Sequence, residues 1–76
     1  MSVEKEVCSI IADLLGVDPL SVALSDSLHD DLGADSLDMV QLQMNLEEHF
    51  GCRVPDGDMI EWVTVKDVVI TMENLI

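Results

Sequence analysis

Ser36 is the residue best placed to carry chemistry, because it lies between an aspartate and a leucine in the string GADSLDMV, residues 33–40. A serine becomes a nucleophile when a neighbouring base takes its proton, and the local string GADSL lacks the GxSxG pattern of many hydrolases. The chain has two histidines, His29 and His49. If residues 36–50 are helical, the rise of ~1.5 Å per residue places His49 roughly 20 Å from Ser36. The sequence therefore disfavours a Ser–His catalytic site.

Carboxylates are the second group of side chains that could do chemistry here, as ligands of a divalent cation. Asp56 and Asp58 resemble the first and third ligands of a calcium loop, but Glu61 stands at the sixth position, where glycine is needed. Asp67 rather than glutamate stands at the twelfth position. No metal site is predicted, although four aspartates near Ser36 are expected to bind cations weakly: Asp30, Asp31, Asp35 and Asp38.

The position of Ser36 at the start of a predicted helix offers a different role for its hydroxyl. The first turn of a helix exposes free N–H groups and the positive end of the helix dipole, and both favour a phosphate. Ser36 could therefore bear a phosphodiester that another enzyme attaches, or it could simply help to cap the helix. The local chemistry leaves both interpretations open.

Two segments precede this serine. Apolar residues recur at helical spacing over residues 3–15, with Ser2 as the expected N-cap and Gly16 as the expected stop. Residues 17–35 then form a long connection, with a helical turn expected over residues 27–31. Its apolar side chains indicate that it packs against the helices: Leu20, Val22, Leu24, Leu28 and Leu32.

Three more segments complete the expected fold. Residues 36–50 are the strongest helical signal, with Asp35 as N-cap. Residues 52–63 are expected to form a loop and a short helix, and Thr64 to cap a last helix that runs to the end of the chain. The prediction is an all-α single domain over residues 1–76. Its architecture is a small four-helix bundle of three longer helices and one short helix, with a long first connection.

The helix over residues 36–50 carries two apolar rows. The better core face consists of Met39, Leu42, Leu46 and Phe50. A second row is rotated away from it and consists of Leu37, Val40 and Met44. The pattern fits either a wide buried arc or an exposed row that meets a partner protein.

The charge of the chain restricts its partners. Sixteen acidic residues against three basic ones give a formal net charge of -13, which repels nucleic acid and anionic lipid but attracts basic protein surfaces. No leader is recognised, and no apolar run approaches the ~20 residues of a membrane span. Cys8 and Cys52 form no metal or redox motif, and Cys8 is expected to be buried. These features predict a cytoplasmic protein without nucleic-acid binding or membrane insertion.

The string DLGADSLDMVQL, residues 31–42, resembles the signature of acyl carrier proteins, whose D-S-L serine bears a 4′-phosphopantetheine arm. The matching residues around the serine are Asp31, Leu32, Gly33, Ala34, Asp35, Ser36, Leu37 and Asp38. The similarity continues through Leu42, Met44, Leu46, Glu47, Glu48, Phe50, Val54, Pro55 and Asp56, and so covers essentially the whole chain.

The resemblance implies a monomeric, non-catalytic carrier. A phosphopantetheinyl transferase would attach the arm to Ser36 from coenzyme A, and the thiol of the arm would hold acyl groups as thioesters. Basic patches on synthase enzymes of fatty acid biosynthesis, or of a related specialised lipid pathway, would then bind the carrier. The implied partner-binding residues are Asp35, Leu37, Asp38, Val40, Gln41, Met44, Glu47, Glu48, Asp56 and Ile60. The implied acyl pocket consists of Met39, Leu42, Leu46, Val54, Met59, Trp62 and Val68.

The chain also departs from the family pattern. Gln41 stands where a glutamate is common, Met39 and Gln43 differ from the commoner Thr and Val, and Ile60 and Trp62 help to make the segment DGDMIEWV more apolar than usual. Trp62 could shorten or reshape an acyl pocket, and its indole N–H needs a partner. Because of these departures, a carrier of a specialised pathway remains an alternative to the housekeeping carrier of fatty acid synthesis.

Two alternative functions remain from the sequence. One is a peptidyl, aminoacyl or polyketide carrier. The other is an acidic interaction module whose Ser36 is never modified. The concentration of seven acidic residues between Asp26 and Glu48, around one serine, favours the carrier over a mimic of nucleic acid.

Overall fold

The computed structural model describes residues 2–76. Its first helix, α1 (Val3–Leu15), begins where the Oγ of Ser2 accepts a hydrogen bond from the backbone N–H of Lys5 at 3.1 Å. The helix ends at Gly16, whose φ of 71° lies in the left-handed region that favours glycine. The predicted helix, its cap and its stop are confirmed.

The second helix, α2 (Ser36–Phe50), packs against α1. Its cap is reciprocal, because the side chain of Asp35 accepts from the backbone of Asp38 and the side chain of Asp38 accepts from the backbone of Asp35. An exposed hydrogen bond of 3.1 Å between His49 Nε2 and Glu6 Oε1 links its last turn to α1.

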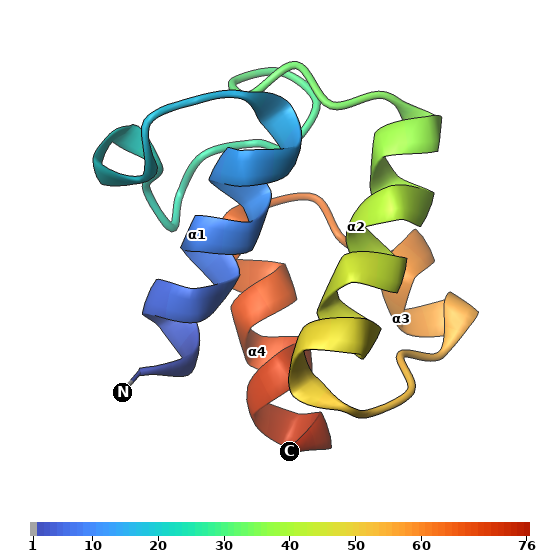
Figure 1. Cartoon of the computed structure of the whole chain (residues 1–76). Coiled ribbons are helices and arrows are strands. Elements are labelled where there is room, and N and C mark those ends of the chain that lie inside the picture. The colour runs from blue at the N-terminus through green and yellow to red at the C-terminus, as the bar shows by residue number, and fades with distance from the viewer. Residues whose placement is uncertain (1) are drawn as a thin grey trace.

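Two helices follow, as predicted. The short α3 (Asp56–Ile60) contacts α2, and α4 (Val65–Leu75) packs against α1. Thr64 and Asp67 form a second reciprocal cap at the start of α4. Figure 1 shows α1 running opposite to α2 and α4, with α3 on the side of α2 away from α1. The expected all-α four-helix architecture is confirmed for the described residues.

The long connection is tied down at its second half. Leu28 donates its N–H to the carbonyl of Val63 at 2.9 Å, and Val65 donates to that of Asp26 at 3.1 Å. A hydrogen bond from Asp31 N to Ser27 O closes the expected helical turn. These bonds hold the residues before Ser36 against the start of α4.

The first half of the connection differs from the prediction. It forms a 3₁₀ helix, η1 (Pro19–Ser21), which the sequence pattern did not indicate. Leu20 is 95 % exposed there, so the expectation that it packs against the helices was wrong for this residue. The expectation is confirmed for the other four apolar side chains of the connection, because Leu28 is in the core and Val22, Leu24 and Leu32 pack against it. Asp18 caps this turn by accepting a hydrogen bond from the N–H of Leu20, so the turn is formed by local bonds.

The core is almost wholly aliphatic. Its fully buried side chains come from all the longer helices and from the connection: Val7, Ile11, Leu28, Leu46, Val65, Val68 and Met72. Cys8 lies at the edge of this core and is half-buried, not buried as expected, and partial burial raises the pKa of its thiol. None of the helices over residues 2–76 is both long and apolar enough to span a bilayer.

Candidate functional site

Ser36 begins α2 with an exposed side chain. The capping role that the sequence left open belongs to its neighbours, because Asp35 Oδ1 accepts from Asp38 N at 2.9 Å and Asp38 Oδ2 accepts from Asp35 N at 3.1 Å. Among residues 2–76, nothing is hydrogen-bonded to the Ser36 hydroxyl. The hydroxyl is therefore accessible and free to react at the positive end of a helix.

The loop before Ser36 is held by short-range contacts. Gly33 adopts a φ of 75°, and the N–H of Ala34 donates to the carbonyl of Leu28 at 2.8 Å. The ring of His29 hydrogen-bonds the Ala34 carbonyl through Nδ1, and a carbonyl partner requires the proton on that nitrogen. His29 was not predicted to belong to the site. The sequence does not indicate this contact, because the contact forms only when the loop folds back onto the Ala34 carbonyl.

An apolar recess of about 290 Å³ opens beside Ser36. Its lining comes from the loop, α2, α3 and the residues after α3: His29, Ser36, Met39, Val40, Met59, Ile60 and Trp62. The structure thus brings Met39, Met59 and Trp62, three of the residues assigned to an acyl pocket, next to the serine. An apolar recess at this place is suited to an aliphatic group carried on Ser36.

The other residues assigned to the acyl pocket lie elsewhere. Leu42, Leu46 and Val68 are buried in the closed core and do not line the recess. Val54 is also buried, and it lines a separate polar cleft between α2 and the segment that leads into α3. A role for these four residues in an acyl pocket stays a prediction.

The second apolar row of α2 is exposed. Leu37 is 79 % exposed, and Val40 and Met44 follow it on the outer surface of the same helix. Ile60 of α3 is exposed as well and lines the same recess as Val40. Of the two interpretations of the row, the buried arc is therefore excluded.

The polar residues assigned to partner binding are divided between exposed and half-buried positions. Asp35, Gln41, Glu48 and Asp56 are exposed, whereas Asp38 and Glu47 are half-buried. Glu47 Oε2 accepts a hydrogen bond from the N–H of Val54 at 2.8 Å, so this carboxylate also links α2 to the segment before α3. The exposed carboxylates surround the apolar row with negative charge.

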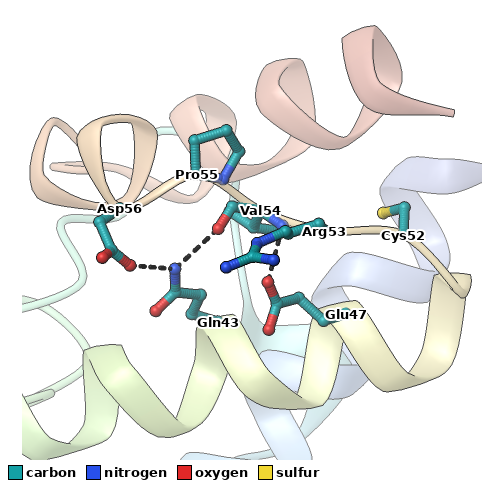
Figure 2. A pocket seen from close by; sticks show the side chains of 7 residues that line it. All are labelled: Gln43, Glu47, Cys52, Arg53, Val54, Pro55 and Asp56. Carbon is teal, nitrogen blue, oxygen red and sulfur yellow. Dashed lines mark hydrogen bonds between the residues drawn. The ribbon is translucent and has the colours of Figure 1, made fainter.

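A polar cleft of about 560 Å³ lies between α2 and the segment that leads into α3 (Figure 2). Gln43 is at its centre, with only 7 % of the residue exposed. Its Nε2 donates to the carbonyl of Val54 at 2.8 Å and to Oδ1 of Asp56 at 2.9 Å. Sequence reasoning noticed Gln43 only as a departure from Val, and no local signal predicted these bonds across the cleft.

The aspartates around Ser36 do not converge on a common point. Asp31 accepts the N–H of Ser27 at 2.7 Å, and Asp35 and Asp38 are engaged in the helix cap. Across the part of the chain that the structure describes, no three His, Cys, Asp or Glu side chains are grouped to hold a metal ion. The structure offers no support for the weak cation site expected there.

Comparison with known proteins extends these observations. A family model described as the phosphopantetheine attachment site matches residues 5–71. An acyl carrier protein of Campylobacter hominis is 44 % identical over 75 residues, which is 99 % of this chain and 95 % of the relative. An acyl carrier protein of Bdellovibrio bacteriovorus is 47 % identical over 74 residues, which is 97 % of this chain and 95 % of the relative.

Solved structures show the same arrangement of helices. A structure named as an acyl carrier protein from Mycobacterium tuberculosis matches with a TM-score of 0.90 and 30 % identity, over 96 % of this chain and 97 % of that chain. The apo doublet acyl carrier protein from prodigiosin biosynthesis matches with a TM-score of 0.82 and 23 % identity, over 96 % of this chain and 35 % of that chain. The second likeness concerns the fold alone.

Proposed function

Because this chain belongs to the acyl carrier protein family, with its phosphopantetheine attachment site, we propose that Ser36 bears the arm and that the chain carries acyl groups in fatty acid biosynthesis or a related specialised lipid pathway. Members of the family are carriers, not enzymes, and hold 4′-phosphopantetheine covalently on a serine. The arm, once attached, supplies a thiol that carries acyl groups as thioesters.

The observation that carries this proposal is the free hydroxyl of Ser36. It is exposed at the first position of α2, while Asp35 and Asp38 supply the cap. A modifying enzyme can therefore use the Ser36 Oγ without removing any hydrogen bond that holds the helix. The first-turn N–H groups of α2 favour the negative charge of a phosphodiester, typically by about 0.3–1 kcal/mol at an exposed helix end.

The recess beside Ser36 fits the cargo of such an arm. Met39, Val40, Met59 and Ile60 give it an apolar lining, and methionine side chains adapt easily to differently shaped chains. A group placed there is shielded from water on the side of α2 and α3. His29 adds one polar ring at the serine end of the recess.

Partner enzymes would bind to the outer surface of α2. Leu37, Val40 and Met44 offer apolar contact area, and the acidic residues around them attract a basic patch on the partner. Charge attraction with a modest apolar area allows fast exchange between successive enzymes. The apolar Ile60 on α3 enlarges this surface and supports a specialised set of partners.

The remaining expectations belong to the same proposal. A net charge of -13 opposes self-association and supports a monomer. Cys8 and Cys52 are free thiols in the described structure, which is usual for a protein of the reducing cytoplasm. Residues 2–76 share one hydrophobic core, which supports a single carrier domain over residues 1–76.

Intact mass spectrometry tests the proposal directly. The protein is incubated with coenzyme A and a broad-specificity phosphopantetheinyl transferase, and we expect a gain of one phosphopantetheine. Ser36→Ala should keep the helical circular dichroism spectrum and lose the gain, whereas Ser25→Ala, another exposed serine, should retain it. A folded wild-type protein that gains no mass would refute the assignment of Ser36 and favour an unmodified acidic interaction module.

A further inference from the structure

Trp62 separates two hollows of the molecule. On one side it lines the apolar recess of about 290 Å³ beside Ser36. On the other side it lines a second hollow of about 180 Å³ between the α3 segment and α4. The residue is only 4 % exposed and borders both hollows, so we treat its side chain as the wall between the two spaces.

This wall is anchored to α4. The indole Nε1–H donates to Oγ1 of Thr71 at 3.0 Å, and the hydroxyl of Thr71 donates in turn to the carbonyl of Asp67 at 3.0 Å. A rotation of the indole away from this position would leave a buried N–H without its partner, which is unfavourable. Trp62 is therefore held in place and does not act as a flexible gap-filler.

The two hollows differ in chemistry. The recess beside Ser36 is lined mainly by aliphatic and methionine side chains. The second hollow contains three carboxylates, those of Asp58, Glu61 and Asp67. Burying an alkyl chain against ionised carboxylates would cost their hydration, so the second hollow does not extend the apolar space.

The core gives no other extension. Leu42, Leu46 and Val68 are fully or almost fully buried and line neither hollow. An alkyl chain that enters beside Ser36 meets the indole of Trp62 and must stop or turn outward. The size of the recess then decides how much of the chain is covered.

We propose that Trp62 limits the acyl chain that this carrier shelters to about eight carbons. The proposal rests on the proposed function, because it requires an arm on Ser36 that brings the chain to the recess. A group the size of a water molecule occupies about 30 Å³ in a liquid, so a recess of about 290 Å³ has room for a chain on the order of ten such groups long. The open mouth of the recess reduces this number. Longer chains leave their distal carbons in water or on a partner surface.

The test uses a series of saturated acyl chains on the arm. Butanoyl, hexanoyl, octanoyl, dodecanoyl and hexadecanoyl groups are transferred with their arm from the corresponding coenzyme A thioesters. Hydroxylamine cleaves the thioester when that group is exposed to solvent. A slower cleavage rate therefore reports that the acyl chain, bound in the recess, keeps its thioester against the protein. Trp62 is the single tryptophan, so its fluorescence reports contact with the chain independently.

We expect cleavage to slow with chain length up to octanoyl and then to stop changing. Each further methylene that enters the recess should slow cleavage by up to about fourfold, which is the factor that corresponds to burial of one methylene. The tryptophan emission should shift over the same range and reach its limit at the same length. Protection that keeps rising from octanoyl to hexadecanoyl in the wild-type protein overturns the proposal without any variant.

Three variants locate the limit at Trp62. Trp62→Ile removes much of the wall, so protection should continue to dodecanoyl. Trp62→Phe keeps an aromatic ring in the wall but loses part of the indole and its hydrogen bond to Thr71, so its limit should stay closer to octanoyl than that of Trp62→Ile. Ile70→Ala enlarges the second hollow without opening the wall and should behave like the wild type.

The possible results distinguish a failure of the proposal for Trp62 from a failure of the proposed carrier function. If the arm attaches and Trp62→Ile shows the wild-type limit, the proposal for Trp62 is wrong and the carrier function stands. If no arm attaches to folded protein, both fail together, and the mass measurement shows it. Circular dichroism of each variant confirms folding, and the wild-type series decides the matter if Trp62→Ile does not fold.

Discussion

Replacement of Gln43 by valine should destabilise the fold through the bonds that this side chain makes across the polar cleft. Gln43 Nε2 donates to the carbonyl of Val54 at 2.8 Å and to Oδ1 of Asp56 at 2.9 Å. Val54 lies on the segment that leads from α2 into α3, and Asp56 is the first residue of α3 (Figure 2). Valine can replace neither bond, and the backbone oxygen of Val54 loses its donor in a buried place.

The size of the effect follows from the burial of each partner. A buried carbonyl that loses its donor costs about 1–3 kcal/mol. The bond to Asp56 contributes less than about 1 kcal/mol, because Asp56 is exposed and water replaces the amide. The apolar valine needs no partner, which offsets part of the loss. We expect a decrease of about 2 kcal/mol in the free energy of unfolding, or a fall in Tm of about 10 °C for a domain of this size.

Gln41 provides a matched control on the same helix. Its Nε2 donates to Oδ1 of Asn45 at 2.8 Å, but this bond lies on the exposed surface of α2. Gln41→Val should change the free energy of unfolding by no more than about 0.5 kcal/mol. Urea unfolding followed by circular dichroism measures both variants under the same conditions. Equal losses for the two variants, or a loss below about 0.5 kcal/mol for Gln43→Val, would show that the cleft bonds do not stabilise the fold.

Two further predictions concern the partner surface and the second helix cap. Leu37→Ala should leave Tm nearly unchanged, because the side chain is 79 % exposed, yet it should raise the KM of the phosphopantetheinyl transferase for this protein. Leu20→Ala, at an exposed position far from Ser36 in the sequence, should leave that KM unchanged. Equal KM values for the two variants would contradict the proposal that the outer surface of α2 binds partner enzymes. The pKa of Asp67 is lowered by hydrogen bonds from the backbone N–H groups of Thr64 and Val63, so its stabilising effect is present above the ordinary aspartate pKa and is lost as the pH falls through the lowered value. Asp67→Ala should therefore reduce the loss of stability on acidification in urea melts at a series of pH values, and an unchanged pH profile would argue against this cap.

The helices and their ends were predictable because they depend on residues close in sequence. The two reciprocal caps, Asp35 with Asp38 and Thr64 with Asp67, each require only a spacing of three residues. The two apolar rows of α2 were also visible from helical periodicity. The sequence did not reveal which of the two rows faces water, because burial depends on the elements that pack against the helix.

The missed features all involve contacts between segments. Leu20 is apolar, but its side chain points away from the contact between the 3₁₀ turn and α1, so its exposure could not be predicted from its type. His29 reaches the site through a loop that folds back onto the carbonyl of Ala34. Gln43 finds its partners on the far side of a cleft, at Val54 and Asp56.

The sequence by itself determined four helices, their caps, the acidic surface and the position of the candidate Ser36 at the start of α2. Each of these follows from local spacing, composition or a contiguous motif, which the chain carries before it folds. Only the tertiary structure decided that the Ser36 hydroxyl is free, that a recess lies beside it and that Trp62, hydrogen-bonded to Thr71, lines that recess. These features arise when α2, α3 and α4 pack together, because a cavity and its wall exist only between surfaces that packing brings into contact.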